Sequence, residues 1–198
     1  MKTIEIELYE FDELSDSVKQ TVLERYSEIN VDDTWYDPIF EGSREQIIEE
    51  GFEIKDILFS GFWSQGDGAM FTYTGLDQNI LDKAVDNLSI PNWKKEVLKN
   101  GYISGKGSQT GHYYHLNSCS HSIYVEPDNG MQGYYNIERL FSQYHEEIEK
   151  YIIQIYKELC SSIYTNLEQY YNELTSDEYV AETIIENGYT FTKEGMRM

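Results

Sequence analysis

The sequence predicts an α+β fold: an antiparallel sheet of four or more strands packed with helices, including one long helix near the C-terminus. Several short segments alternate apolar and polar residues, as half-buried strands do, and one long stretch keeps helical spacing. Hydrophobic residues make up 40% of the 198 residues, enough for a core. We therefore expect a single α+β domain over residues 1–198. Its strands are predicted at residues 3–9, 53–62, 68–74 and 111–126.

The first segment, residues 3–9, alternates strictly between apolar and acidic or polar positions. Its isoleucines and leucine fall on one face, which is typical of a half-buried strand. Helical spacing then predicts a helix over residues 16–29, for which Ser15 is a suitable N-cap. A second helix is predicted to begin at Asp37, which precedes a proline, and to end at Gly51.

Two strands, residues 53–62 and 68–74, are predicted on either side of a glycine-rich turn. The apolar pattern of the first changes phase near Lys55-Asp56. The turn contains Asp67-Gly68, the usual pair of a type I′ hairpin. Two short helices are then expected, and residues 102–110 form either a flexible loop or the end of a strand.

Residues 111–126 are predicted to form a hairpin whose turn is Asn117-Ser118. A two-residue turn would pair His112 with Ile123. One sheet face would then combine apolar and titratable side chains: His112, Tyr114, Leu116, Cys119, His121, Ile123 and Val125.

The long helix is predicted over residues 134–174, where apolar residues recur every three or four positions. At about 1.5 Å per residue it would reach roughly 50 Å, so it is expected to project or to kink. A break is expected near Cys160-Ser161-Ser162. A short helix capped by Gly188 and a strand at residues 189–192 complete the chain.

Charge excludes several classes of function. The formal net charge is -21, from 15 basic and 36 acidic residues. Direct nucleic-acid binding and membrane-surface binding both need the opposite sign. The charge fits solubility alone, or attraction to a partner protein with a basic surface. Two cysteines without metal or redox spacing, together with the lack of a signal peptide or a membrane-spanning stretch, predict a cytoplasmic protein.

The glycine-rich turn is the first candidate site. It has neither the lysine of a phosphate-binding loop nor a dinucleotide fingerprint. One interpretation is a structural turn and nothing more. The other is a binding loop, in which a tryptophan stacks on a small ligand and polar groups hydrogen-bond to it. The residues of that loop are Ser60, Trp63, Ser64, Gln65 and Asp67.

Three histidines lie close together in sequence: His112, His115 and His121. They could contribute to the same ligand site, or supply a general base near Asp67 if the two hairpins meet. A metal site is not favoured, because His112 and His115 point to opposite faces of a strand. No nucleophile motif is present, so the sequence leaves catalysis open but favours a non-catalytic protein without a cofactor.

Acidic clusters on predicted helices are the third candidate. Each cluster is explained by a solvated helix face, yet together they could mimic phosphates and occupy the basic groove of a nucleic-acid-binding protein. The residues of this acidic contact surface are Glu45, Glu49, Glu50, Glu146, Glu147, Glu149, Asp177, Glu178, Glu182 and Glu186.

Residues 59–69, Phe-Ser-Gly-Phe-Trp-Ser-Gln-Gly-Asp-Gly-Ala, resemble the hallmark segment of a family of small acidic bacteriophage and prophage proteins. Gly-His-Tyr-Tyr-His at residues 111–115 is similar to a second segment of that family. The opening at residues 9–15 and the end at residues 184–195 resemble it as well. The resemblance implies a phage origin and the bacterial host cytosol, but no activity.

Two functions follow as hypotheses. The first is an acidic, phage-encoded interaction protein that inhibits a host defence or nucleic-acid-binding protein, of the anti-CRISPR or another counter-defence type. The alternative is a small-ligand or nucleotide-binding protein, or an enzyme. Its site would be formed by the turn at residues 60–68 and the hairpin at residues 111–121.

Overall fold

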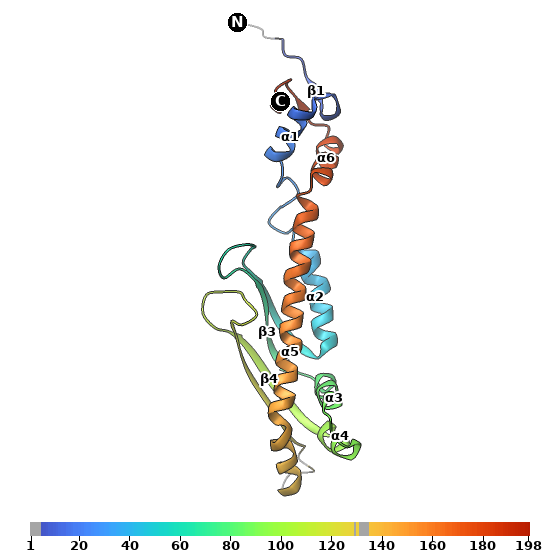
Figure 1. Cartoon of the computed structure of the whole chain (residues 1–198), viewed down its shortest axis with the longest axis vertical. Coiled ribbons are helices and arrows are strands. Elements are labelled where there is room, and N and C mark those ends of the chain that lie inside the picture. The colour runs from blue at the N-terminus through green and yellow to red at the C-terminus, as the bar shows by residue number, and fades with distance from the viewer. Residues whose placement is uncertain (1–4, 129, 131–134) are drawn as a thin grey trace. The chain divides into compact units, whose positions relative to one another are not determined.

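The computed structural model describes residues 5–128, 130 and 135–198. These residues form helices together with antiparallel sheets, which confirms the α+β class (Figure 1). The chain divides into two compact units, one of residues 1–37 with 167–198 and the other of residues 38–166. The single domain stays a prediction, because one helix, α5 (Tyr135–Leu174), continues through the boundary between the units.

The larger unit contains a four-stranded antiparallel sheet in the order β2-β3-β4-β5. Its strands are β2 (Phe52–Phe59), β3 (Ala69–Leu76), β4 (Gly101–Gln109) and β5 (Cys119–Pro127). The pairing of β2 with β3 shifts register between Ile54 and Asp56, which confirms the predicted change of phase. A long loop at residues 60–68 joins β2 to β3, and another at residues 110–118 joins β4 to β5. The two loops lie side by side in Figure 1.

Within the larger unit, helix α5 packs on one face of the sheet. The Tyr156 hydroxyl donates a hydrogen bond of 3.0 Å to the Phe71 carbonyl oxygen of β3. The Tyr156 ring also contacts the His121 ring of β5, with centroids 4.5 Å apart. Because one helical side chain reaches both strands, α5 closes the core over the middle of the sheet.

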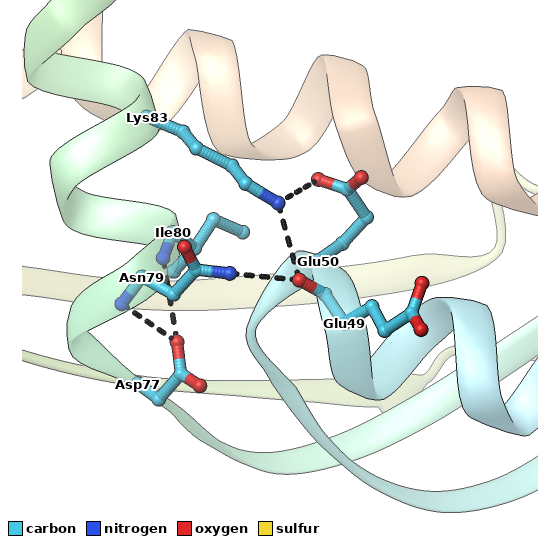
Figure 2. Close-up of polar contacts among 6 residues, drawn as sticks. All are labelled: Glu49, Glu50, Asp77, Asn79, Ile80 and Lys83. Carbon is cyan, nitrogen blue, oxygen red and sulfur yellow. Dashed lines mark hydrogen bonds and ion pairs between the residues drawn. The ribbon is translucent and has the colours of Figure 1, made fainter.

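Helices α2 (Asp37–Glu50), α3 (Gln78–Asn87) and α4 (Asn92–Lys99) complete this unit. Gly51 ends α2 with φ 103°, a left-handed conformation that glycine adopts without strain. Asp77 caps α3, because its side chain accepts hydrogen bonds from the backbone nitrogens of Asn79 and Ile80 (Figure 2). The Asn79 amide donates to the Glu49 carbonyl oxygen at 2.7 Å and so ties the end of α2 to the start of α3.

The smaller unit joins the two ends of the described chain. The strands β1 (Tyr9–Glu10) and β6 (Thr190–Phe191) pair antiparallel, with Tyr9 opposite Phe191. A short 3-10 helix (Phe11–Glu13), α1 (Asp16–Arg25) and α6 (Asp177–Glu186) surround a small core. The buried side chains of that core are Phe11, Leu14, Val22, Val180, Ile184 and Phe191.

Several expectations need correction. Residues 5–8 of the predicted strand 3–9 form no strand, and residues 3–4 lie outside the described residues. The alternation gives this segment an apolar face, but Ile6 and Leu8 on that face stay about half exposed. The helix predicted over residues 16–29 ends at Arg25. Helix α5 is continuous through Cys160-Ser161-Ser162, while residue 134 of its predicted range is not described.

The predicted hairpin over residues 111–126 is wrong in its first strand. β5 pairs with β4, so Gln109 faces Cys119 and Gly107 faces His121. The pairing of His112 with Ile123 therefore does not occur. The glycine- and serine-rich stretch before residue 110 forms the strand, because its small residues fit beside bulky core side chains. A Cβ at Gly107 would collide with the Tyr73 ring.

Candidate binding site

The loop at residues 60–68 is not the two-residue type I′ turn that Asp67-Gly68 predicted. Its ends meet where the Ser60 nitrogen donates to the Gly68 carbonyl oxygen at 3.2 Å. The tight turn lies inside the loop, where the Asp67 nitrogen donates to the Ser64 carbonyl oxygen at 3.1 Å. The Asp67 carboxylate also accepts from the Ser64 nitrogen at 2.8 Å. Asp67 therefore organises the loop through its side chain as well as its backbone.

Trp63 combines exposure with an unusual backbone conformation. Its side chain is 71% exposed, although tryptophan is the largest apolar residue available to a core. Its φ of 64° is in the left-handed region, which costs a bulky residue roughly 1–2 kcal/mol. Backbone strain of this kind clusters at binding and catalytic sites. The loop thus holds an aromatic ring in solvent at an energetic cost.

Trp63 belongs to a row of aromatic rings that reaches helix α5. Its ring lies 5.3 Å from that of Phe62, and the Phe62 ring lies 5.6 Å from that of Tyr164. Phe62 also packs on Phe59 at the end of β2, at 4.9 Å. These contacts fix the outer part of the loop against the helix.

The loop at residues 110–118 packs directly against the loop at residues 60–68. A Cβ at Gly66 would collide with the Tyr113 ring. A Cβ at Gly68 would lie 2.9 Å from the Tyr114 carbonyl oxygen and 3.2 Å from the His115 Cα. Only glycine permits so close an approach at these positions. The meeting of the two segments, which sequence alone left open, is therefore a property of the fold.

A cavity of about 260 Å³ lies where the two loops meet helix α5. Two of the predicted ligand-binding residues, Asp67 and His115, line it. Ser60, Trp63, Ser64, Gln65 and His112 are on the same loops but do not line the cavity. The residues that line it are Asp67, Gly68, Ala69, His115, Leu116, Cys160, Ser161, Tyr164 and Thr165.

The helical half of this lining was absent from the sequence-based prediction. Ser161, Tyr164 and Thr165 are spaced three and four residues apart, so they share one face of α5. That spacing was a usable signal. The break predicted near Cys160-Ser161-Ser162 conflicts with that signal, and the structure has none there.

The residues that line the cavity include one carboxylate, Asp67, and several hydrogen-bonding side chains, but no lysine or arginine. The His115 Nδ1 accepts from the Asn117 nitrogen at 3.2 Å, so a neutral ring carries its proton on Nε2. Burial raises the pKa of the Cys160 thiol to about 12, which keeps it protonated and without nucleophilic character. The cavity therefore suits a neutral or cationic guest better than an anion.

His121 is separated from this cavity and lies in the interior. Its Nδ1 is 3.0 Å from the Tyr73 hydroxyl, and its ring packs between those of Tyr73 and Tyr156. Burial lowers the pKa of His121 to about 4, and the positive charge of Lys157 adds to this shift. His121 is therefore a half-buried residue that is neutral at physiological pH, and it does not line the cavity with His115.

Most of the proposed acidic contact residues are exposed, and two are ion-paired. In the larger unit, Glu50 pairs with Lys83 at 2.9 Å and Glu146 with Lys150 at 2.6 Å. Glu49 uses its carbonyl oxygen for the α2–α3 junction, while its carboxylate points away from the other residues drawn in Figure 2. Glu45 and Glu147 are exposed and Glu149 is half-buried.

The remaining acidic contact residues belong to the smaller unit. Asp177 and Glu178 lie in the first turn of α6, where a negative charge is favoured by the helix dipole. Glu182 and Glu186 follow along the same helix. All four are exposed, so α6 presents an acidic surface to solvent.

The described residues lack both a membrane-spanning helix and a cluster of metal ligands. No helix among them is both long and apolar enough to span a bilayer. They contain no group of three or more histidine, cysteine, aspartate or glutamate side chains arranged to hold a metal ion.

The larger unit contains the four-stranded sheet, most of helix α5 and the loop cavity. The model of a domain of unknown function, DUF8835, matches residues 35–177, and the chain belongs to this family. The matched range includes all of the larger unit and therefore the whole cavity. No curated protein matches the chain, and no solved structure matches it.

Proposed function

We propose that this protein is an acidic interaction protein, and that a side chain of a basic partner protein enters the loop cavity. The main observation in support of this proposal is the cavity itself. Its volume of about 260 Å³ is below the roughly 300–1,000 Å³ of ordinary small-molecule pockets, which suits one side chain better than a whole metabolite. The exposed Trp63 close by is the kind of residue that dominates the binding energy of protein interfaces.

Charge determines the chemistry of the partner in this proposal. The net charge of -21 attracts a basic surface and repels nucleic acid. The cavity lining offers an entering arginine or lysine the acidic residue Asp67 and the hydroxyl-bearing residues Ser161, Tyr164 and Thr165, and it contains no lysine or arginine of its own. Its cationic head can also lie against an aromatic ring, as arginine does at many interfaces.

The resemblance to phage proteins supplies the setting. In a bacterial cytosol, the partner would be a host defence or nucleic-acid-binding protein, such as a CRISPR effector. The acidic side chains would occupy the groove that this protein uses for nucleic acid. An inhibitor of this type competes with DNA or RNA for the partner.

The test compares two tryptophans of the larger unit. Trp63 is 71% exposed in the loop, and Trp93 is 63% exposed at the start of α4, outside the cavity lining. Trp63→Ala is expected to weaken binding of a purified host partner by about tenfold or more, the loss of an interface hot spot. Trp93→Ala is expected to leave the affinity unchanged. Calorimetry with the partner recovered from infected cells measures both.

Equal affinities of the two tryptophan variants would contradict a role for the loop cavity. Competition gives a second readout. Added DNA should displace the protein from the partner, and replacing Glu45 and Glu49 by glutamine should make that displacement easier. A partner that binds DNA and this protein at the same time would contradict phosphate mimicry.

A small-ligand function is the second candidate, because the two loops and α5 do enclose one cavity. A neutral nucleoside fits its hydrogen-bonding groups better than a nucleotide, whose phosphates would meet no lining cation. Adenosine, guanosine, cytidine and uridine can each be titrated while the side-chain NMR signals of His115 and Tyr164 are followed. Saturable shifts that a His115→Ala variant loses would favour this function over the first.

A further inference from the structure

Residues 5–8, at the N-terminal edge of the smaller unit, have the sequence pattern of a strand but pair with no strand. One side of β1 pairs with β6. Phe191 of β6 also forms an isolated antiparallel bridge with Arg197. Within the described residues, β1 is thus the edge of this sheet. The residues before it, 5–8, lie in no strand although their sequence alternates. Ile6 is 51% exposed and Leu8 is 49% exposed, so their apolar face is uncovered.

A groove of about 620 Å³ lies beside this edge. Tyr9 of β1 lines it, together with the apolar residues Leu14 and Val18. A strand laid along β1 could place a side chain in this groove. The residues that line it are Tyr9, Glu13, Leu14, Ser15, Val18, Lys193 and Glu194.

The charges around the edge are mostly negative. Glu7 accepts a hydrogen bond from the Tyr9 hydroxyl at 2.9 Å. This bond, the charge of Glu7 itself and the nearby carboxylates of Glu13 and Glu194 raise the pKa of Tyr9. Lys193 is the one cation among the residues that line the groove. A basic neighbour is therefore favoured at this edge, and an acidic one is repelled.

We propose that residues 5–10 add as an edge strand to the sheet of a partner protein, whose paired strand alternates basic and apolar side chains. Backbone hydrogen bonds would supply affinity, as in other cases of strand addition. The basic residues would face Glu5 and Glu7, and the apolar residues would cover Ile6 and Leu8. A second copy of the chain is a poorer partner, because antiparallel self-pairing centred on Glu7 brings like charges together.

This surface belongs to the smaller unit and is independent of the loop cavity. Residues 5–10 also precede the family match, which begins at residue 35. The edge strand would therefore be a property of this chain in addition to the family module. Its failure in an experiment would leave the proposed function of the cavity untouched.

The test uses a synthetic probe, an acetylated and amidated heptapeptide that alternates lysine and valine, and a control peptide with the same composition in scrambled order. The alternating probe is expected to bind the full chain about tenfold more tightly than the scrambled one. Glu7→Pro removes a backbone N–H but keeps Ile6 and Leu8, so it should abolish the preference. Glu7→Gln keeps the N–H, and should retain the preference with a weaker salt dependence.

Thermal unfolding checks that both Glu7 variants fold. Trp63→Ala is a second control, and it should bind the alternating probe as tightly as the unaltered chain does. Equal binding of the two peptides, or unchanged binding by Glu7→Pro, would overturn the proposal. So would sedimentation showing a dimer of the unaltered chain that Glu7→Pro converts to a monomer, because the occupant would then be a second copy.

Discussion

The loop at residues 60–68 and the interior between the sheet and α5 contain similar side chains in opposite surroundings. The interior holds Tyr73, His121 and Tyr156, whose polar atoms bond to one another or to the backbone. The loop holds Trp63 in solvent with a strained backbone. Aromatic and polar residues grouped in a sequence thus indicate function only where folding leaves them exposed.

The largest expected effect lies in the interior. Tyr156 is fully buried, and it contacts Phe71, Tyr73 and His121. Tyr156→Ala should lower the free energy of unfolding by about 3–5 kcal/mol, because it leaves a cavity where several rings meet. Tyr156→Phe keeps the ring and loses the hydrogen bond to Phe71, so it should cost only about 1 kcal/mol. Urea unfolding measures both.

Similar losses for the alanine and phenylalanine variants would contradict this account, because the hydroxyl and not the ring would then dominate. The phenylalanine variant also tests whether a change in the interior alters partner binding at the loop cavity. Tyr156 lies one helical turn before Cys160, which lines the cavity. Partner binding by Tyr156→Phe should therefore be retained if the cavity is rigid.

A smaller effect is expected in the loop, where strain is the main term. Alanine at position 63 keeps a side chain at positive φ, whereas glycine adopts this conformation freely. Trp63→Gly should therefore be more stable than Trp63→Ala by about 1 kcal/mol. At ordinary sites without strain, glycine is the less stable of the two.

Both Trp63 variants should lose partner binding, although they differ in stability. Chemical unfolding and calorimetry on the same two proteins make the comparison. If Trp63→Gly were the less stable variant, the loop would not store strain, and the contrast between loop and interior would lose its basis.

Periodic patterns predicted the elements that bury a face. The alternation in β5 placed His121, Ile123 and Val125 on the face toward the core, as the structure has them, and the spacing in α5 predicted its length. These patterns succeed because burial selects residue type directly. The predicted stop of α2 at Gly51 is confirmed for a similar local reason, since a left-handed backbone selects glycine.

Pairing and loop geometry could not be predicted in the same way. β4 contains several glycines and serines, so its pattern looks like a linker until the bulky side chains beside it are known. Asp67-Gly68 has the local chemistry of a two-residue turn, but a wider loop forms because Asp67 bonds back to Ser64. The cavity depends on three segments distant in sequence, and only the fold brings Asp67, His115 and Tyr164 together.

A pH dependence of stability is also expected from the interior. Burial lowers the pKa of His121 to about 4 in the folded chain, against 6.5 for an ordinary histidine. Between these values the unfolded chain binds a proton at this site that the folded chain does not. The free energy of unfolding should therefore fall as pH decreases from 6.5 toward 4, with no further loss from this group at lower pH.

Replacing His121 by glutamine removes this proton linkage while keeping a polar partner for the Tyr73 hydroxyl. Melting temperatures between pH 7 and pH 4 should decrease less steeply in His121→Gln than in the unaltered chain. His112→Gln, in the exposed loop, is the matched control for losing an imidazole outside the interior. Parallel melting curves for the unaltered chain and His121→Gln would mean that solvent reaches this histidine, and the interior would then resemble the loop in its exposure.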